Sequence, residues 1–232
     1  CSIAPVPDMM APVVVCYTNK AAYSYNQMIR DKYYDGDSSV QVGDRVVISV
    51  NAKTQNRTVL NGEFAMVTEV SDKVESLQGV AYVNVAGEEK KQKVTVTLNF
   101  RDIRLLFDDG VEIPVKIHEA FLNGPARKLT YLQVCALISN FRMRHPDLKK
   151  GTKEYIDALS HDPYFNALCV KYGYAITCHK AQGGQWSYVY VDQGYMTDDM
   201  LTPSYIHWLY TAFTRATHRL NLINWPKEQT EE

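Results

Sequence analysis

The sequence begins and ends with alternating strand and helix patterns, and these enclose a long stretch that contains strand patterns only. Residues 13–17 form an apolar run typical of a buried strand, and residues 20–34 carry apolar side chains at helical spacing. Near the other end, similar patterns predict strands at 175–177, 187–192 and 220–223 and a helix at 203–213. The chain is therefore predicted to be α/β, with an insertion between the two parts of the frame.

The inserted stretch, residues 40–117, has the features of a small antiparallel β unit. Asn61-Gly62 lies between two short apolar runs, 58–60 and 63–67, and predicts a tight hairpin. Residues 80–85 and 92–100 predict a second hairpin closed by residues 86–90. Further strands are predicted at 44–50, where Val46, Ile48 and Val50 share one face, and at 111–117. A barrel is one way to close such a unit.

A helical segment follows, with helices predicted at 131–144 and 151–160. Between residues 116 and 150, seven basic residues face two acidic ones, although the whole chain has a net charge of −1. The basic residues are Lys116, Arg127, Lys128, Arg142, Arg144, Lys149 and Lys150. This excess indicates either a solvated helix face or a patch that binds phosphate.

Composition excludes several classes of protein. With 232 residues, 46% hydrophobic and 22% charged, the chain is long and apolar enough to bury a core. It contains no apolar run long enough to span a membrane, and its pI near 6.7 excludes binding of nucleic acid through bulk charge. Its five scattered cysteines, without a C-x-x-C pair, predict neither a disulfide framework nor a zinc site and favour the cytoplasm.

The sequence lacks the motifs of a self-sufficient enzyme. No G-x-x-x-x-G-K-S/T loop is present to hold nucleotide phosphates, and no G-x-G-x-x-G occurs. Cys178 and His179 are adjacent, but neighbouring strand residues face opposite ways, so they do not predict a protease. Because the chain also begins with Cys1 and not Met, we expect it to be part of a longer protein.

Two segments, 174–186 and 210–220, nevertheless carry residues suited to chemistry. In the first, small and polar residues directly follow a predicted strand. In the second, Arg215 lies near the end of an otherwise apolar helix. Such an arginine either pairs with a buried carboxylate or points at a ligand anion, and the residues alone leave both possibilities open.

These two segments resemble motifs V and VI of superfamily-one helicases, in particular the RecD-like branch, whose members include exodeoxyribonuclease alpha subunits. The matching residues are Thr177, His179, Lys180, Gln182, Gly183 and Trp186 in motif V, and Tyr210, Ala212, Thr214, Arg215 and Ala216 in motif VI. Three further segments are similar to the start of the second motor lobe and of its inserted barrel: residues 16–30 with Asn26 and Arg30, Gly43-Asp44-Arg45-Val46, and residues 60–63.

The resemblance implies a fold, a division into domains and a set of roles. Residues 11–38 and 163–227 would form a RecA-like lobe of the P-loop NTPase type, 39–117 a barrel of the Src-homology-three type, and 118–162 a basic helical insertion. By match, Arg215 is the catalytic arginine finger. The implied nucleotide-binding residues are Gln182, Gly183, Gln185 and Arg215, and the implied nucleic-acid-binding residues are Thr18, Asn19, Thr177, His179 and Lys180.

Several of these positions have a second interpretation. Gln185 stands where the family usually has a ribose-contacting Glu, so nucleotide preference stays open. Thr18 or Asn19 could cap the helix that follows. Trp186 and Phe64 could stack on bases but more often such residues pack in a core, and Arg219 is expected at the surface.

The resemblance also implies partners and cofactors. The chain would act as the carboxy-terminal lobe of a monomeric ATP-dependent DNA helicase in DNA repair and recombination, with single-stranded DNA and an amino-terminal RecA-like lobe as partners. ATP and Mg²⁺ would be bound in the complete protein, with Mg²⁺ held by the other lobe. The alternatives are a nucleic-acid-binding module without ATPase activity and a degenerate lobe that serves as a scaffold.

Overall fold

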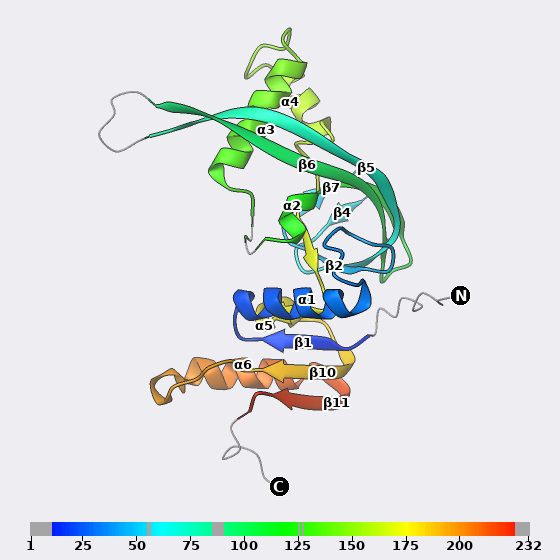
Figure 1. The fold of residues 1–232 in the computed structure, drawn as a ribbon, viewed down its shortest axis with the longest axis vertical. Helices are drawn as coiled ribbons and strands as arrows, with labels where there is room; N and C mark the ends of the chain where they lie inside the picture. Colours follow the sequence, from blue (N-terminus) through cyan, green and yellow to red (C-terminus); the bar gives the residue numbers. More distant parts are fainter. Residues whose placement is uncertain (1–10, 55–56, 85–90, 125, 127, 226–232) are drawn as a thin grey trace.

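The computed structural model describes residues 11–54, 57–84, 91–124, 126 and 128–225, and its fold class is α/β, as predicted (Figure 1). Four strands form a parallel sheet in the order β11-β10-β1-β9. Their bounds are β1 Val13–Cys16, β9 Ala175–Thr177, β10 Trp186–Asp192 and β11 Ala216–Ile223. Strands from both ends of the chain therefore lie side by side, as the α/β patterns at the two ends require.

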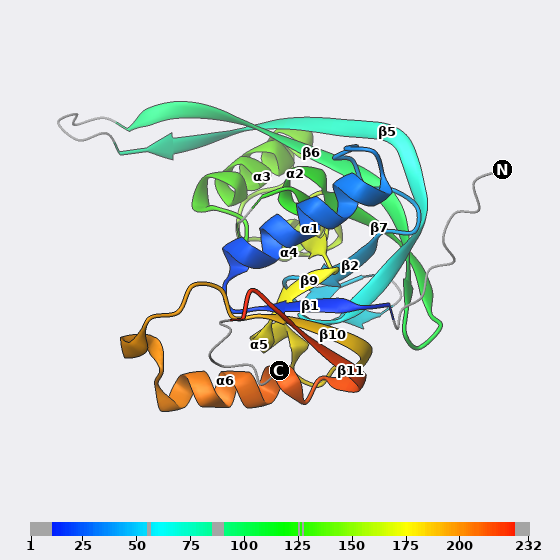
Figure 2. The same ribbon diagram turned by 60° about the horizontal axis from the view of Figure 1, so that its bottom comes forward.

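Helices cover both faces of this sheet (Figure 2). Val13 and Val15 of β1 pack toward α6 (Pro203–Phe213) and α5 (Cys178–Ala181), whereas Val14 and Cys16 pack toward α1 (Asn19–Tyr33). The first strand is apolar at every position because each of its faces is buried.

The inserted unit is a second sheet, with the strand order β7-β6-β5-β2-β8 and antiparallel pairing throughout. The bounds are β2 Arg45–Ile48, β5 Phe64–Val83, β6 Gln92–Phe107, β7 Glu112–His118 and β8 Val170–Tyr172. The sheet closes where the Leu168 amide donates to the Lys116 carbonyl at 2.7 Å and the His118 amide donates to the Leu168 carbonyl at 3.1 Å. These bonds join its two edges into a barrel around an apolar core.

The second predicted hairpin is confirmed, and it is longer than predicted. Val83 pairs with Gln92, and the two strands remain paired to Ala65 and Phe107, so that β5 and β6 form a ribbon that projects from the barrel (Figure 1). Residues 85–90, at the end of this predicted hairpin, lie outside the described residues.

The predicted hairpin at 58–67 is wrong in its pairing. The turn exists, because the Glu63 amide donates to the Leu60 carbonyl and Gly62 has a φ of +96°. However, β4 (Thr58–Val59) pairs with β3 (Ala52–Lys53), and β5 pairs with β2. Strand β2 also ends at Ile48, so Val50 is exposed and does not continue its buried face.

The described part of the helical segment contains three helices, and the side chains of Thr130 and Thr152 cap the second and third of them. The helices are α2 Glu119–Leu122, α3 Tyr131–Arg144 and α4 Lys153–His161, and a short 3-10 helix spans Asp198–Met200. Helix α3 packs against the ribbon at Gly79, where an added Cβ would lie 1.9 Å from the Ala136 carbonyl oxygen. A side chain at this position would therefore separate helix and ribbon.

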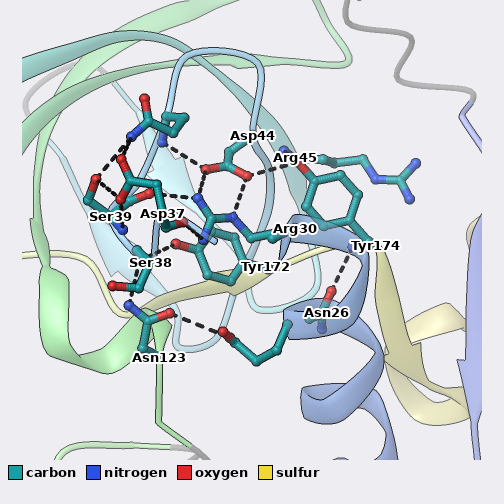
Figure 3. A network of polar contacts seen from close by, with 12 residues as sticks. Asn26, Arg30, Asp37, Ser38, Ser39, Asp44, Arg45, Asn123, Tyr172 and Tyr174 are labelled. Carbon is teal, nitrogen blue, oxygen red and sulfur yellow. Dashed lines mark hydrogen bonds and ion pairs between the residues drawn. The ribbon is translucent and has the colours of Figure 1, made fainter. Parts of the chain in front are cut away.

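A buried polar network joins helix α1 to the barrel (Figure 3). Arg30 binds the Asp44 carboxylate through two hydrogen bonds of 2.9 Å each, and both side chains are at most 1% exposed. One turn earlier, the Asn26 side chain donates to the Ala175 carbonyl at 2.7 Å and accepts from the Tyr174 and Ala175 amides. Helix α1 thus holds both the parallel sheet and the barrel.

Two of the seven basic residues in the segment 116–150 form ion pairs with carboxylates in the described part of the chain. Lys116 contacts Glu75 and Asp102, and Arg144 contacts Asp162 at 2.6 Å. Three of the remaining cations, Arg142, Lys149 and Lys150, border a shallow hollow of about 650 Å³, whereas Arg127 lies outside the described residues.

The predicted domain division stays a prediction, although β8, at the start of the predicted second part of the lobe, pairs in the barrel sheet. None of the helices in the described ranges combines the length and apolar character needed to cross a membrane.

Candidate nucleic-acid and nucleotide sites

A groove of about 500 Å³ lies between the N-terminal half of α1, the barrel strand β2, helix α5 and the ends of β8 and β9. Four of the five predicted nucleic-acid-binding residues line it: Asn19, Thr177, His179 and Lys180. Strands β1 and β9 are parallel neighbours with Cys16 paired to Thr177, so Thr177, the last residue of β9, and Asn19, three residues after β1, lie at the same edge of the sheet. The structure thus brings together residues that are about 160 positions apart in the sequence.

Helix α5 presents the polar residues of motif V to this groove. Thr177, its N-cap position, is buried, whereas His179 is exposed. The Lys180 ammonium donates to the Ser49 hydroxyl, just beyond β2, at 3.4 Å. Lys180 therefore spans from the parallel-sheet lobe to the barrel across one end of the groove.

Thr18, the fifth predicted residue, has a structural role that the sequence left as an alternative. Its hydroxyl oxygen accepts a hydrogen bond from the Ala21 amide at 3.1 Å and caps helix α1. Thr18 does not line the described groove, whereas Asn19 does. A contact from Thr18 to nucleic acid stays a prediction.

Lys171, in β8, is a cation of the groove that sequence reasoning missed. Its ammonium donates to the carbonyls of Phe121 and Gly124 and lies 3.9 Å from the centre of the Phe121 ring. Burial, with a further contribution from the charge of Lys180, lowers the pKa of Lys171 to about 8. The groove therefore holds two nearby lysines, and no Asp or Glu is among the described residues that line it.

This charge distribution suits a polyanion. The charge of Lys180 contributes to the lowered pKa of Lys171, and a phosphate bound near both ammonium groups would offset this repulsion. Asn19, Ser49 and Asn61 add polar side chains along the same walls. The groove can therefore bind a phosphate backbone without reading its sequence.

The second predicted site is centred on Arg215, directly after helix α6. Its guanidinium donates to three neutral oxygens: the Thr211 carbonyl at 2.9 Å, the Gly184 carbonyl at 3.2 Å and the Thr214 hydroxyl at 2.9 Å. Among the ion pairs of the described residues, none involves Arg215. The interpretation of Arg215 as half of an ion pair therefore finds no partner in the described part of the chain.

Motif V holds this arginine from the other side. The Trp186 amide donates to the Arg215 carbonyl at 2.9 Å, so backbone bonds from both ends of the turn at 184–186 reach Arg215. Gln182 and Gln185 are exposed beside it, and Gly183 has a φ of +84°, which favours glycine. The structure thus gathers the predicted nucleotide-binding residues around one turn.

A second hollow of about 500 Å³ adjoins the groove and shares Asn61, His179 and Lys180 with it. Its other walls carry three acidic residues, Glu63, Asp108 and Asp109, together with Arg57, which pairs with Glu63 and Asp109. The predicted nucleotide-binding residues Gln182 and Gly183 also line this hollow. Burial and the neighbouring Asp109 raise the pKa of Asp108. The second hollow therefore contains carboxylates that the described residues of the groove lack, and the groove is the better site for the backbone of a bound strand.

The aromatic residues proposed for stacking pack against each other. Trp186 is 4% exposed, and its ring meets that of Phe64 edge to face at 5.6 Å between centroids. Trp186 belongs to the core beneath α6, with Phe64 packed against it. For these two residues the structure shows the core-packing alternative.

Comparisons with known proteins identify a family for one segment of the chain. Residues 172–223, which contain both motifs, match the family described as UvrD-like helicase C-terminal domain. Over this segment the chain resembles the carboxy-terminal lobe of a superfamily-one helicase. The match covers less than half of the chain, and no curated protein sequence matches.

Three solved structures are similar over most of the chain. A Pif1 helicase from Candida albicans is 16% identical, with 96% of this chain and 47% of that chain covered and a TM-score of 0.46. A structure of DNA unwinding at forked duplex DNA by two coordinating Pif1 helicases is 13% identical, with coverages of 95% and 41% and a TM-score of 0.45. A Bacteroides Pif1 in complex with ADP-AlF3 and ssDNA is 10% identical, with coverages of 100% and 46% and a TM-score of 0.43. The chain spans less than half the length of each of these proteins.

Proposed function

We propose that this chain is the carboxy-terminal motor lobe of an ATP-dependent DNA helicase or translocase of the RecD-like branch. One observation carries the proposal. The segment 177–186 lines the groove with Thr177, His179 and Lys180 and, a few residues later, holds Arg215 through Gly184 and Trp186. A displacement of this segment by a bound strand would therefore move the arginine, which is the coupling that a motor requires.

In this proposal Arg215 acts as an arginine finger. Its guanidinium is held by neutral oxygens, so its full positive charge is available to a nucleotide phosphate. An arginine finger stabilises the charge of the transferred phosphoryl group and contributes about 10³–10⁵ in rate in nucleotide hydrolases. Gln182, Gly183 and Gln185 would lie around the nucleotide beside it.

The phosphate-binding loop and the magnesium ligands would come from an amino-terminal RecA-like lobe of the same protein. ATP hydrolysis would take place at the junction of the two lobes, and this chain alone is expected to be inactive.

The experiment compares two arginines of the full-length protein in single-strand-stimulated ATP hydrolysis. Arg215→Ala should lower kcat by about 10³-fold or more, while the Kd for single-stranded DNA changes by less than about two-fold because Arg215 does not line the groove. Arg219→Ala is the matched control, since Arg219 is an exposed arginine four residues later in the chain, and should turn over normally.

Undiminished turnover in Arg215→Ala would remove Arg215 from catalysis. A second candidate function is a nucleic-acid-binding module without ATPase activity, favoured by a groove whose described lining contains Lys171 and Lys180 and neither Asp nor Glu. Binding of DNA by a full-length protein that does not hydrolyse ATP would support it. Absence of both activities would leave the scaffold alternative.

A further inference from the structure

Tyr17 is an aromatic side chain of the groove that no motif accounts for. It directly follows β1, the residue is 37% exposed, and it lines the groove together with Asn19, Thr177 and Lys180. The other two aromatic residues along the described groove are less available: Tyr172 is buried, and the Tyr23 hydroxyl donates to the Asn123 carbonyl at 3.0 Å.

The buried side of the Tyr17 ring is held by two other aromatic rings. Its centroid lies 5.2 Å from that of Trp208 and 6.3 Å from that of Tyr205, with interplanar angles of 71° and 64°. Trp208 and Tyr205 stack on each other at 5.9 Å and belong to the core beneath α6. The Tyr17 amide also donates to the Asp192 carbonyl at 3.2 Å. Ring and backbone are thus positioned before any ligand binds, which reduces the entropic cost of stacking on the ring.

We propose that Tyr17 is a stacking platform for a nucleobase of the strand that occupies the groove. The inference rests on the proposed nucleic-acid role of the groove and adds base contacts to the phosphate contacts of Lys171 and Lys180. A base in a duplex is stacked on both of its faces, so a ring such as Tyr17 selects for single-stranded nucleic acid. Because every base has an aromatic face, this contact does not depend on sequence.

The test measures binding of two oligonucleotides of equal length and charge to the full-length protein. One is oligo-dT, and the other carries abasic sites in place of every base. Replacing Tyr17 by Leu keeps an apolar side chain against Trp208 but removes the aromatic face. Affinity for oligo-dT should fall about 5-fold to 150-fold, the equivalent of about 1–3 kcal/mol for one stacked base. Affinity for the abasic strand should stay within about two-fold of the wild type.

Two control variants separate this inference from the function on which it rests. Tyr17→Phe keeps the ring and should bind both strands as the wild type does, whereas Lys180→Ala should weaken both strands equally. An unchanged affinity of Tyr17→Leu for oligo-dT, or an equal loss for both strands, would overturn the stacking role while leaving the groove as the binding site. A wild-type protein that binds neither strand would overturn both proposals.

Discussion

The buried ion pair between Arg30 and Asp44 should be the largest single electrostatic contribution to the joint between helix α1 and the barrel. Arg30→Met removes the guanidinium and keeps a long apolar side chain against Tyr172, whose ring centre lies 4.0 Å from the guanidinium carbon. The Asp44 carboxylate, which is 0% exposed, would then remain buried without its cation. The Ser39 carbonyl would also lose its donor, at 2.6 Å.

The loss of unfolding free energy depends on the Asp44 carboxylate that remains buried in the variant. Removing one partner of a buried ion pair costs about 3–5 kcal/mol, because the other charge is left uncompensated. Asp44 keeps hydrogen bonds of 2.8 Å from the Tyr174 hydroxyl and from the Gln41 amide. These donors still solvate the carboxylate, so we expect the lower part of this range, about 3 kcal/mol.

Urea denaturation at pH 7 measures the effect as a change in the midpoint at constant m-value. The matched control is Arg104→Met, which breaks an arginine–carboxylate contact of 3.0 Å to Glu69 between side chains that are 42% and 69% exposed. This control should cost less than about 1 kcal/mol, because exposed pairs are screened by solvent.

A double variant tests whether the cost comes from the uncompensated charge. Arg30→Met combined with Asp44→Leu removes both charges. The double variant should lose about 1–3 kcal/mol less unfolding free energy than the two single variants lose together. Strict additivity, or a cost of Arg30→Met no larger than that of Arg104→Met, would refute the reasoning.

Three further predictions concern other parts of the structure. Gly79→Val should destabilise the fold by about 2 kcal/mol or more, because its side chain would collide with the Ala136 carbonyl. Thermal unfolding measures this loss. Gly124→Ala is the control, because an added Cβ there meets no atom closer than 3.5 Å. Burial lowers the pKa of His118 to about 4, below its unfolded value of about 6.5. The unfolded state therefore binds more protons between these values, and the free energy of unfolding should fall by up to about 3 kcal/mol as pH falls from 6.5 to 4. Urea denaturation at several pH values measures this loss, which should be smaller in His118→Phe. Because the pKa of Lys171 is about 8, affinity for single-stranded DNA should fall as pH rises through 8, and an identical pH profile in Lys171→Met would contradict this assignment.

Elements with strong local signals could be predicted from the sequence. The predicted helices at 131–144 and 203–213 coincide with α3 and α6, because Thr130 and Thr202 accept hydrogen bonds from the first turn of each helix. The four strands of the parallel sheet were also predicted, although β11 begins four residues earlier than expected. In these cases local capping and apolar patterning agree with the tertiary structure.

The errors fall where pairing depends on distant residues. A two-residue signal at Asn61-Gly62 predicted the turn, but the partners of the flanking strands are set by the barrel core, which contains Val59 and Ala65. Strand β8 was missed because three residues carry no periodicity, and its pairing with β2 joins positions more than 120 residues apart.

In the candidate site, too, residues within a local motif could be predicted, and residues placed by contacts between distant segments could not. The resemblance to helicase motifs selected Asn19, Thr177, His179 and Lys180, which line one groove. Lys171 and Tyr17 could not be selected in this way, since a lysine or tyrosine beside a motif has no local signal that it faces a groove. Their positions become evident only after the barrel and the parallel sheet are in contact.

Helix α1 connects these observations, since its successive turns contact several of the elements that form the groove. Its first residue, Asn19, lines the groove; Asn26 holds the backbone of β9, which leads into α5; and Arg30 holds Asp44 at the start of β2. The Lys180–Ser49 contact also joins the two sheets, since it crosses from α5 to the residue after β2. Asn26, Arg30 and Asp44, which lie in the segments that resemble a helicase lobe and its barrel, therefore act as a structural joint between the two sheets that border the groove.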